Sequence, residues 1–287
     1  MAGSSTTQRK KRKSKVQLRS LNSQEHLDVD KTVKRLRETK SDLRCESFFE
    51  KWKDELLIAA SDLRHQVLWN KNEESRVSAD HSGNCSSPGQ MQCVCYGLGP
   101  FSSCVSARYQ LAMLLLLLEA AQIELSDCFI YDPIFSNGEK AVLKELGLTV
   151  LTENEEGKRR ANEPTLFYLL HCGKALYNNL LWKNWDTHYL TQMIIIGNCF
   201  SALKDRAIDR EFSRDYNYIS RITSVCKEIL LPCPSHMIDV FSDSAVLTFP
   251  SSDVDKLSQS TWINQQEPQY EHCVDLEIVQ KSKDTSR

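Results

Sequence analysis

The sequence predicts an α/β protein with a Rossmann-like, doubly wound, mostly parallel sheet and an N-terminal helical extension. After residue 90, short apolar runs of strand length alternate with helical patterns. The run at residues 193–196, MIII, is apolar at every position, which suits a parallel strand covered on both faces. A glycine turn joins the first of these runs to a long apolar helix, and such a unit can present backbone N–H groups to a ligand.

The first unit predicts a strand at residues 91–95, a turn and a buried helix from about residue 105 to residue 118. Gly97 and Gly99 end the strand, because glycine adopts backbone angles that other residues avoid. Ser102 or Ser103 is expected to cap the helix. The two glycines match only part of a dinucleotide fingerprint, so a ligand-binding turn and a turn that merely packs the helix both remain open.

The remaining elements follow in alternation. Apolar runs predict further strands at 128–132, 148–151, 166–171, 193–196 and 245–249. Apolar residues at helical spacing predict helices at 137–146, 174–182 and from 216 to the residues before Pro232.

Composition divides the chain into five parts. We expect a disordered basic tail at 1–27, a helical extension at 28–69, a linker at 70–90, the α/β domain at 91–250 and a disordered tail at 251–287. Within that last tail, residues 274–279 are the one stretch where a little local structure is expected. Phe48, Phe49 and Trp52 are expected to dock the helical extension on the domain, although a partner-binding helix is an alternative. The basic run RKKRKSK at 9–15 is a nuclear localisation signal, a patch for nucleic acid or, as the favoured interpretation, a solvated tail.

Charge and cysteine usage exclude several classes of protein. The N-terminus lacks a secretory apolar region, so the eleven cysteines are expected as thiols in the cytoplasm, with nuclear presence also allowed. The longest apolar run, Leu111 to Leu118, is too short to span a membrane. The net charge is −2 and the predicted domain is not basic, which argues against direct nucleic-acid binding.

Ligands of doubly wound sheets bind beyond the carboxyl ends of the strands. The residues at those positions are therefore our ligand-binding candidates, and most of them are expected to line one cleft: Gly97, Gly99, Ser102, Ser103, Asp132, His171 and Asn198. Asp132 either holds the ribose hydroxyls of a nucleotide-like ligand or caps the turn before Pro133.

The sequence assigns no catalytic residue and no metal site. His171 and Cys172 are adjacent and no third group orients them, so a structural or ligand-contact role is favoured for His171. Haem is a separate hypothesis: Cys233, followed by Pro234, is a candidate thiolate ligand, with His236 as a second ligand. A plain loop is the simpler interpretation of that stretch.

Six stretches resemble the sensitivity-to-red-light-reduced (SRR-like) family in its vertebrate form. They cover about residues 45–250 and are CESFFEKWKDEL, VCYGLGPFSSCVSARYQLAMLLLLLE, YDPIFSNGEKAVLKELGLTVLTENEEGKR, TLFYLLHCGKALYNNLLWKNW, IIIGNCFS and VFSDSAVLTFP. The resemblance implies a regulatory protein that acts in haem biosynthesis and in expression of core circadian clock genes, together with protein partners of that regulation. It implies no settled catalytic activity, which favours a non-enzymatic role. The alternative is a nucleotide- or S-adenosylmethionine-dependent enzyme on the same fold.

Overall fold

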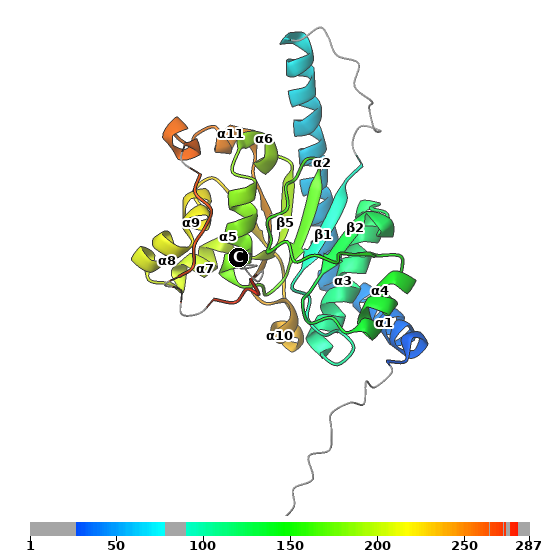
Figure 1. Ribbon diagram of the computed structural model, residues 1–287. Coiled ribbons are helices and arrows are strands. Elements are labelled where there is room, and N and C mark those ends of the chain that lie inside the picture. The colour runs from blue at the N-terminus through cyan, green and yellow to red at the C-terminus, as the bar shows by residue number, and fades with distance from the viewer. Residues whose placement is uncertain (1–26, 78–89, 264, 272, 274–275, 281–287) are drawn as a thin grey trace, which may run out of the picture.

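The computed structural model describes residues 27–77, 90–263, 265–271, 273 and 276–280. It shows one sheet with helices on both faces (Figure 1). The predicted basic tail lies outside the described residues except for residue 27, as do residues 78–89 of the predicted linker.

Seven strands form the sheet in the order β3-β2-β1-β4-β5-β7-β6. The first five are parallel, and β7 is antiparallel to both of its neighbours, which confirms the α/β class and the mostly parallel sheet. The strands are β1 (Gln92–Tyr96), β2 (Cys128–Tyr131), β3 (Thr149–Val150), β4 (Thr165–Leu169), β5 (Met193–Asn198), β6 (Lys227–Leu230) and β7 (Ser244–Thr248).

Strand β1 lies at the centre of the parallel part of the sheet. Cys93 pairs with Cys128 of β2 on one side and with Leu166 of β4 on the other. Val94 and Cys95 point to opposite faces, and both are completely buried. The strand is apolar at consecutive positions because each face is covered by helices.

Two layers of helices make separate apolar cores on the two faces. The first face carries α1 (Val29–Arg44), α2 (Ser47–Val77), α3 (Val105–Ala121), α4 (Asn137–Glu145) and α10 (Ile238–Phe241). The second face carries α5 (Lys174–Lys183), α6 (Thr187–Leu190), α7 (Phe200–Asp205), α8 (Asp209–Asp215), α9 (Asn217–Ile222) and α11 (Ser251–Val254). Short 3-10 turns lie at Leu125–Asp127, Ser235–Met237 and Gln259–Trp262.

The two N-terminal helices are part of the first core. Asp28 caps α1 by accepting a hydrogen bond from the backbone N–H of Lys31 at 2.9 Å. The docking role predicted for Phe48, Phe49 and Trp52 is confirmed, because all three are buried. The Trp52 indole also donates a 2.9 Å hydrogen bond to the Pro232 carbonyl. Helix α2 continues to Val77, eight residues beyond the predicted end of the helical extension, and Figure 1 shows it projecting from the body of the protein.

One predicted helix was too long at its C-terminal end. Helix α9 ends at Ile222, and residues 227–230 form β6 instead of continuing the helix. This strand lies at the edge of the sheet and pairs with β7 alone, so Lys227 and Leu230 remain exposed. An exposed edge strand lacks the apolar run by which a buried strand is recognised.

The predicted start of the C-terminal tail, residue 251, is too early, because the chain remains packed on the domain beyond it. Ser251–Val254 forms α11, and Val254 is completely buried. Further along, Tyr270 is buried, and its hydroxyl donates a 2.8 Å hydrogen bond to the Asn179 side chain on α5. A few apolar residues spaced along a polar segment are sufficient to dock it on the domain. The average composition of the segment does not reveal them, because most of its residues are polar.

The role of Trp52 is testable by truncation. We expect Trp52→Ala to lower the free energy of unfolding by about 3–5 kcal/mol, because the change opens a cavity and orphans the Pro232 carbonyl. Ile58→Ala, on the same helix at a side chain that is 50% exposed, is expected to change it by only about 0.5 kcal/mol. Urea unfolding of both variants checks this, and similar losses would show that α2 is not docked through Trp52.

Candidate functional site

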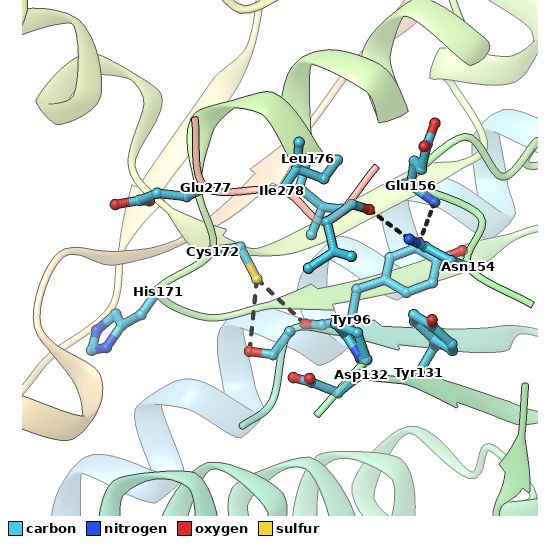
Figure 2. A pocket seen from close by; sticks show the side chains of 15 residues that line it. Tyr96, Tyr131, Asp132, Asn154, Glu156, His171, Cys172, Leu176, Glu277 and Ile278 are labelled. Atoms are coloured by element: carbon cyan, nitrogen blue, oxygen red, sulfur yellow. Dashed lines mark hydrogen bonds between the residues drawn. The ribbon is translucent and has the colours of Figure 1, made fainter. Parts of the chain in front are cut away.

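A cleft of about 400 Å³ opens at the carboxyl ends of β1, β2 and β4. This is the point where the chain crossovers diverge from β1, the place where ligands bind in such sheets. Figure 2 shows Tyr131 and Asp132 on one side of the cleft and the Glu277–Ile278 segment on the other. The lining residues are Tyr96, Gly97, Tyr131, Asp132, Pro133, Asn154, Glu156, Gly157, His171, Cys172, Gly173, Leu176, Glu277, Ile278 and Val279.

The glycine turn after β1 requires its glycines. Gly97 has a φ of +65°, and a Cβ there would lie 2.6 Å from the Cys172 Sγ. The Cys172 thiol donates to the Tyr96 carbonyl at 3.3 Å, so the turns after β1 and β4 are packed directly on each other. Gly99 has a φ of +86° and does not line the cleft.

Asp132 joins the first two turns. One oxygen of its carboxylate accepts from the Gly99 N–H at 2.8 Å, and the other accepts from the Ile134 N–H at 2.9 Å. The hydrogen bond from the Ile134 N–H caps the turn around Pro133, which is one of the two roles predicted for Asp132. A carboxylate has about four acceptor positions, so two remain for a ligand in the cleft that Asp132 lines. Its ribose-binding role stays a prediction.

The two serines of the turn do not cap α3. Residue Cys104 occupies the N-cap position, without a side-chain hydrogen bond. Ser102 donates both its N–H and its hydroxyl to Glu139 Oε1 at 2.9 Å, and the Ser103 hydroxyl donates to the Pro100 carbonyl at 3.3 Å. Residues 101–103 form a turn and α3 begins at Val105 as expected, so the N-cap position falls on Cys104, one residue after Ser103. Neither serine lines the cleft.

Glu139 is a residue that the sequence analysis missed. Its other oxygen accepts from the N–H and hydroxyl of Ser136, which completes a capping box at α4. Burial acts to raise the pKa of this carboxyl, but the hydrogen bonds from Ser102 and Ser136 outweigh it and hold the pKa below its usual range. The Ser-x-x-Glu pattern at 136–139 was the available signal.

His171 and Asn198 are close neighbours. His171 has a φ of +53°, and its N–H donates to Asn198 Oδ1 at 2.9 Å, while Asn198 Nδ2 donates to the Cys172 carbonyl at 3.2 Å. Asn198 therefore holds the turn after β4 in its left-handed conformation. It lines a second cavity of about 290 Å³ rather than the cleft, and His171, Cys172 and Glu277 line both. Of the predicted site residues, Gly97, Asp132 and His171 line the cleft.

The cleft is acidic and its thiol is protonated. Asp132, Glu156 and Glu277 line it, and its described lining contains neither lysine nor arginine. Burial raises the pKa of the Cys172 thiol, and the nearby carboxylates of Asp132 and Glu277 raise it further. Burial and a hydrogen bond to Glu155 likewise raise the pKa of the Tyr96 hydroxyl. Cys172 therefore has the properties of a packing residue rather than a nucleophile.

The sequence analysis missed most of the other lining residues. Tyr131 comes one position before Asp132 at the end of β2, where the strand-end rule could have found it. Glu156 and Leu176 come from a long loop and from the first turn of α5. Glu277 and Ile278 come from the segment expected to be a tail, where the sequence indicated only a little local structure at 274–279 and no place in the cleft.

The haem hypothesis stays a prediction. Cys233 is half-buried, its thiol donates to the Met237 carbonyl at 3.4 Å, and burial raises its pKa. His236 is directed to Glu46, with 3.4 Å between its Nε2 and a carboxylate oxygen. Titration of ferric haem into the wild type and Cys233→Ala would test it.

Within the described part of the chain, no cluster of three or more His, Cys, Asp or Glu side chains could bind a metal ion. Over the same residues, none of the helices combines the length and apolar character that crossing a membrane requires.

Comparison with known proteins identifies the family. The SRR1 domain matches residues 47–272, which is most of the chain. The chain belongs to the SRR1 family. A mouse SRR1-like protein is 43% identical over 207 residues, covering 68% of this chain and 82% of the mouse protein.

More distant members of the SRR1 family match shorter parts of the chain. A Drosophila melanogaster SRR1-like protein is 32% identical over 161 residues, which is 56% of each chain. The Arabidopsis thaliana protein SENSITIVITY TO RED LIGHT REDUCED 1 is 36% identical over 117 residues, 41% of this chain and 42% of its own. No solved structure matches the chain significantly.

The contact between Gly97 and Cys172 is testable by a double-mutant cycle. We expect Gly97→Ala to destabilise the protein by about 2–4 kcal/mol, because it adds left-handed strain to a steric overlap with the Cys172 sulfur. Gly99→Ala is a matched control that adds strain alone, at about 1 kcal/mol, since its Cβ would lie 3.4 Å from the nearest atom.

In the double variant Gly97→Ala with Cys172→Ala, the overlap disappears, because the Cβ of residue 172 lies 3.9 Å away. The two changes should then couple by at least about 1 kcal/mol in denaturant unfolding. Simple additivity of the two losses would contradict the proposed packing.

Proposed function

We propose that this SRR1-family protein is a regulatory protein whose cleft binds a nucleoside-type ligand that is uncharged or cationic. The observation that carries the proposal is the position of Asp132, directly after β2 and in the wall of the cleft. An acid at this position holds ribose hydroxyls in nucleotide-binding folds. Its two remaining acceptor positions match the two hydroxyls of a ribose.

The rest of the lining supports such a ligand. Tyr96, Tyr131 and Leu176 offer aromatic and aliphatic surface for a base. The cleft volume of about 400 Å³ falls at the lower end of the usual range for small-molecule sites. The close packing of Gly97 on Cys172 keeps the turns rigid, so the site is largely formed before a ligand arrives.

Charge separates the kinds of nucleoside ligand. Three carboxylates line the cleft, and only Glu156 among them forms an ion pair with a lysine, Lys158, within the described residues. Phosphate groups would be repelled by Asp132, and by Glu277 for as long as it lines the cleft, whereas an ammonium or sulfonium group would be attracted. The proposal is therefore a nucleoside or S-adenosylmethionine-like ligand rather than a dinucleotide.

The regulatory part of the proposal rests on family membership. One relative is named for reduced sensitivity to red light, which supports a role in signalling. We propose that ligand occupancy of the cleft controls contacts with protein partners and thereby haem biosynthesis and core clock gene expression. The site of action is proposed to be the cytoplasm and also the nucleus. Nucleic acid is not proposed as a direct partner, since the net charge is −2.

The strand order supports a second candidate function. The order β3-β2-β1-β4-β5 follows the Rossmann-like pattern, and antiparallel β7 lies between β5 and β6, an arrangement typical of S-adenosylmethionine-dependent methyltransferases. In methyl transfer, an acceptor lone pair attacks the methyl carbon while the carbon–sulfur electrons return to sulfur, and the acceptor loses a proton. The second cavity beside His171 offers room for an acceptor. Release of S-adenosylhomocysteine from S-adenosylmethionine in cell extract would distinguish this function from regulation alone.

The ligand class is testable by thermal unfolding. We expect S-adenosylmethionine or S-adenosylhomocysteine, at 100 times its Kd, to raise the Tm by roughly 5–10 °C, because binding stabilises only the folded state. ATP and NAD should give no shift, because their phosphates meet the carboxylates of the cleft.

Asp132→Asn should weaken binding about 10- to 100-fold, since an amide loses charge-assisted hydrogen bonds. Asp239→Asn, at an exposed position on α10, is the matched control and should bind as the wild type does. Equal affinity of the two variants would remove Asp132 from the site. Rescue of clock and haem-enzyme transcripts by the control variant but not by Asp132→Asn would connect the site to regulation.

A further inference from the structure

We propose that residues 276–280, here called the C-terminal strap, occupy the mouth of the cleft and compete with its ligand. The proposal rests on the nucleoside site proposed above and adds its regulation. Ile278 and Val279 line the cleft, and Figure 2 shows the strap opposite Tyr131 and Asp132. The strap thus crosses the point where a ligand would enter.

The strap makes close contact at both of its ends. At one end, Glu277 packs on Gly173, the N-cap residue of α5, so tightly that a Cβ on Gly173 would lie 2.5 Å from the Glu277 Cβ. At the other end, Asn154 Nδ2 donates a 2.6 Å hydrogen bond to the Val279 carbonyl. Between them, Ile278 is half-buried against the second core. These contacts place the strap in one position rather than leaving it in solvent.

The surface of the strap indicates that it can leave. Glu277, Val279 and Gln280 are exposed, with Val279 at 57%. A segment with so few buried apolar groups belongs to the least stable part of a protein. Release would not unfold the preceding chain, because Tyr270 is anchored separately through its hydrogen bonds to α5.

The strap also divides the space at the sheet edge. Glu277, together with His171 and Cys172, lines both the cleft and the second cavity. When the strap leaves, Glu277 leaves with it, and only His171 and Cys172 of these three side chains still separate the cleft from the second cavity. The acidic side chain also adds to the negative charge of the cleft, so its departure removes one of the three lining carboxylates. The strap therefore controls both the volume of the cleft and the negative charge around a bound ligand.

Competition of this kind has a measurable size. The apparent Kd equals the intrinsic Kd divided by the fraction of molecules with an open cleft. If about one molecule in ten is open, removal of the strap raises affinity about tenfold, which is within the usual range of coupling between sites.

The experiment compares the full chain with a chain that ends at residue 275, using S-adenosylhomocysteine as the probe in isothermal titration calorimetry. We expect about tenfold tighter binding to the shortened chain. A chain that ends at residue 280 keeps the strap and should bind as the full chain does.

A point variant tests the same contact in the full chain. Gly173 has a φ of −64°, which any residue tolerates, so Gly173→Ala adds no backbone strain. The three atoms nearest to the added Cβ, at 2.5–3.0 Å, all belong to Glu277. The substitution should displace the strap and tighten binding. In the chain ending at residue 275 the same substitution should have no such effect. Equal effects of Gly173→Ala in the two chains would overturn the proposal.

A measurement without ligand separates this proposal from the proposed function. Amide hydrogen exchange at 154–157 and 171–176 should be faster in the chain ending at residue 275 than in the chain ending at residue 280. If amide exchange differs between the two shortened chains but none of the chains binds S-adenosylhomocysteine, the strap proposal is supported and the proposed nucleoside ligand is wrong. If neither exchange nor affinity differs, the strap is wrong.

Discussion

The position of β1 between two parallel partners is the constraint on which the rest of the structure depends. From β1 the chain reaches β2 through α3 on one face of the sheet, whereas β4 reaches β5 through α5 on the other face. Because such crossovers are right-handed, strands laid down in opposite directions must place their helices on opposite faces. The helices that follow β1 and β4 therefore leave toward opposite faces, and the cleft lies beyond the carboxyl ends of these strands. Residues 93–96 of β1 are all buried, because helices cover this strand on both faces.

Polar contacts then fix the diverging turns relative to one another. Asp132 connects the turn after β2 to Gly99, and Glu139 connects α4 to Ser102. Asn198 supports the turn after β4, where His171 adopts a left-handed conformation that is unfavourable for a residue with a Cβ. Each of these side chains bonds to backbone N–H groups that would otherwise lack partners. The result is a rigid edge, against which a flexible segment such as the strap is the natural element to move.

Prediction from the sequence succeeded mainly where a signal was local, and most of its failures concern contacts between residues far apart in the chain. The strands at 128–131 and 193–198 and the helix at 174–183 were recognised because apolar periodicity is encoded within each segment. Strand β6 was missed because its pairing with β7 is a tertiary contact, and its exposed residues carry no apolar run. Ser102 was expected to cap a helix, yet its partner is Glu139, a residue 37 positions away. Glu277 was placed in a tail because its contact with Gly173 joins residues far apart in the chain and has no local signal.

The sequence by itself determined the α/β class, the helices α3, α4 and α5 and the identity of the residues at strand ends, since these follow from local periodicity and from glycine and proline. It also placed Gly97, Asp132 and His171 at the carboxyl edge of the sheet, because the ends of parallel strands meet at one edge. Only the tertiary structure decided which of these residues share a cleft, because that depends on strand order rather than on position in the chain. It alone placed Asn198 in the neighbouring cavity and brought the strap across the entrance. Contacts between residues more than 100 positions apart, such as Asn154 with Val279, have no local signature in the sequence.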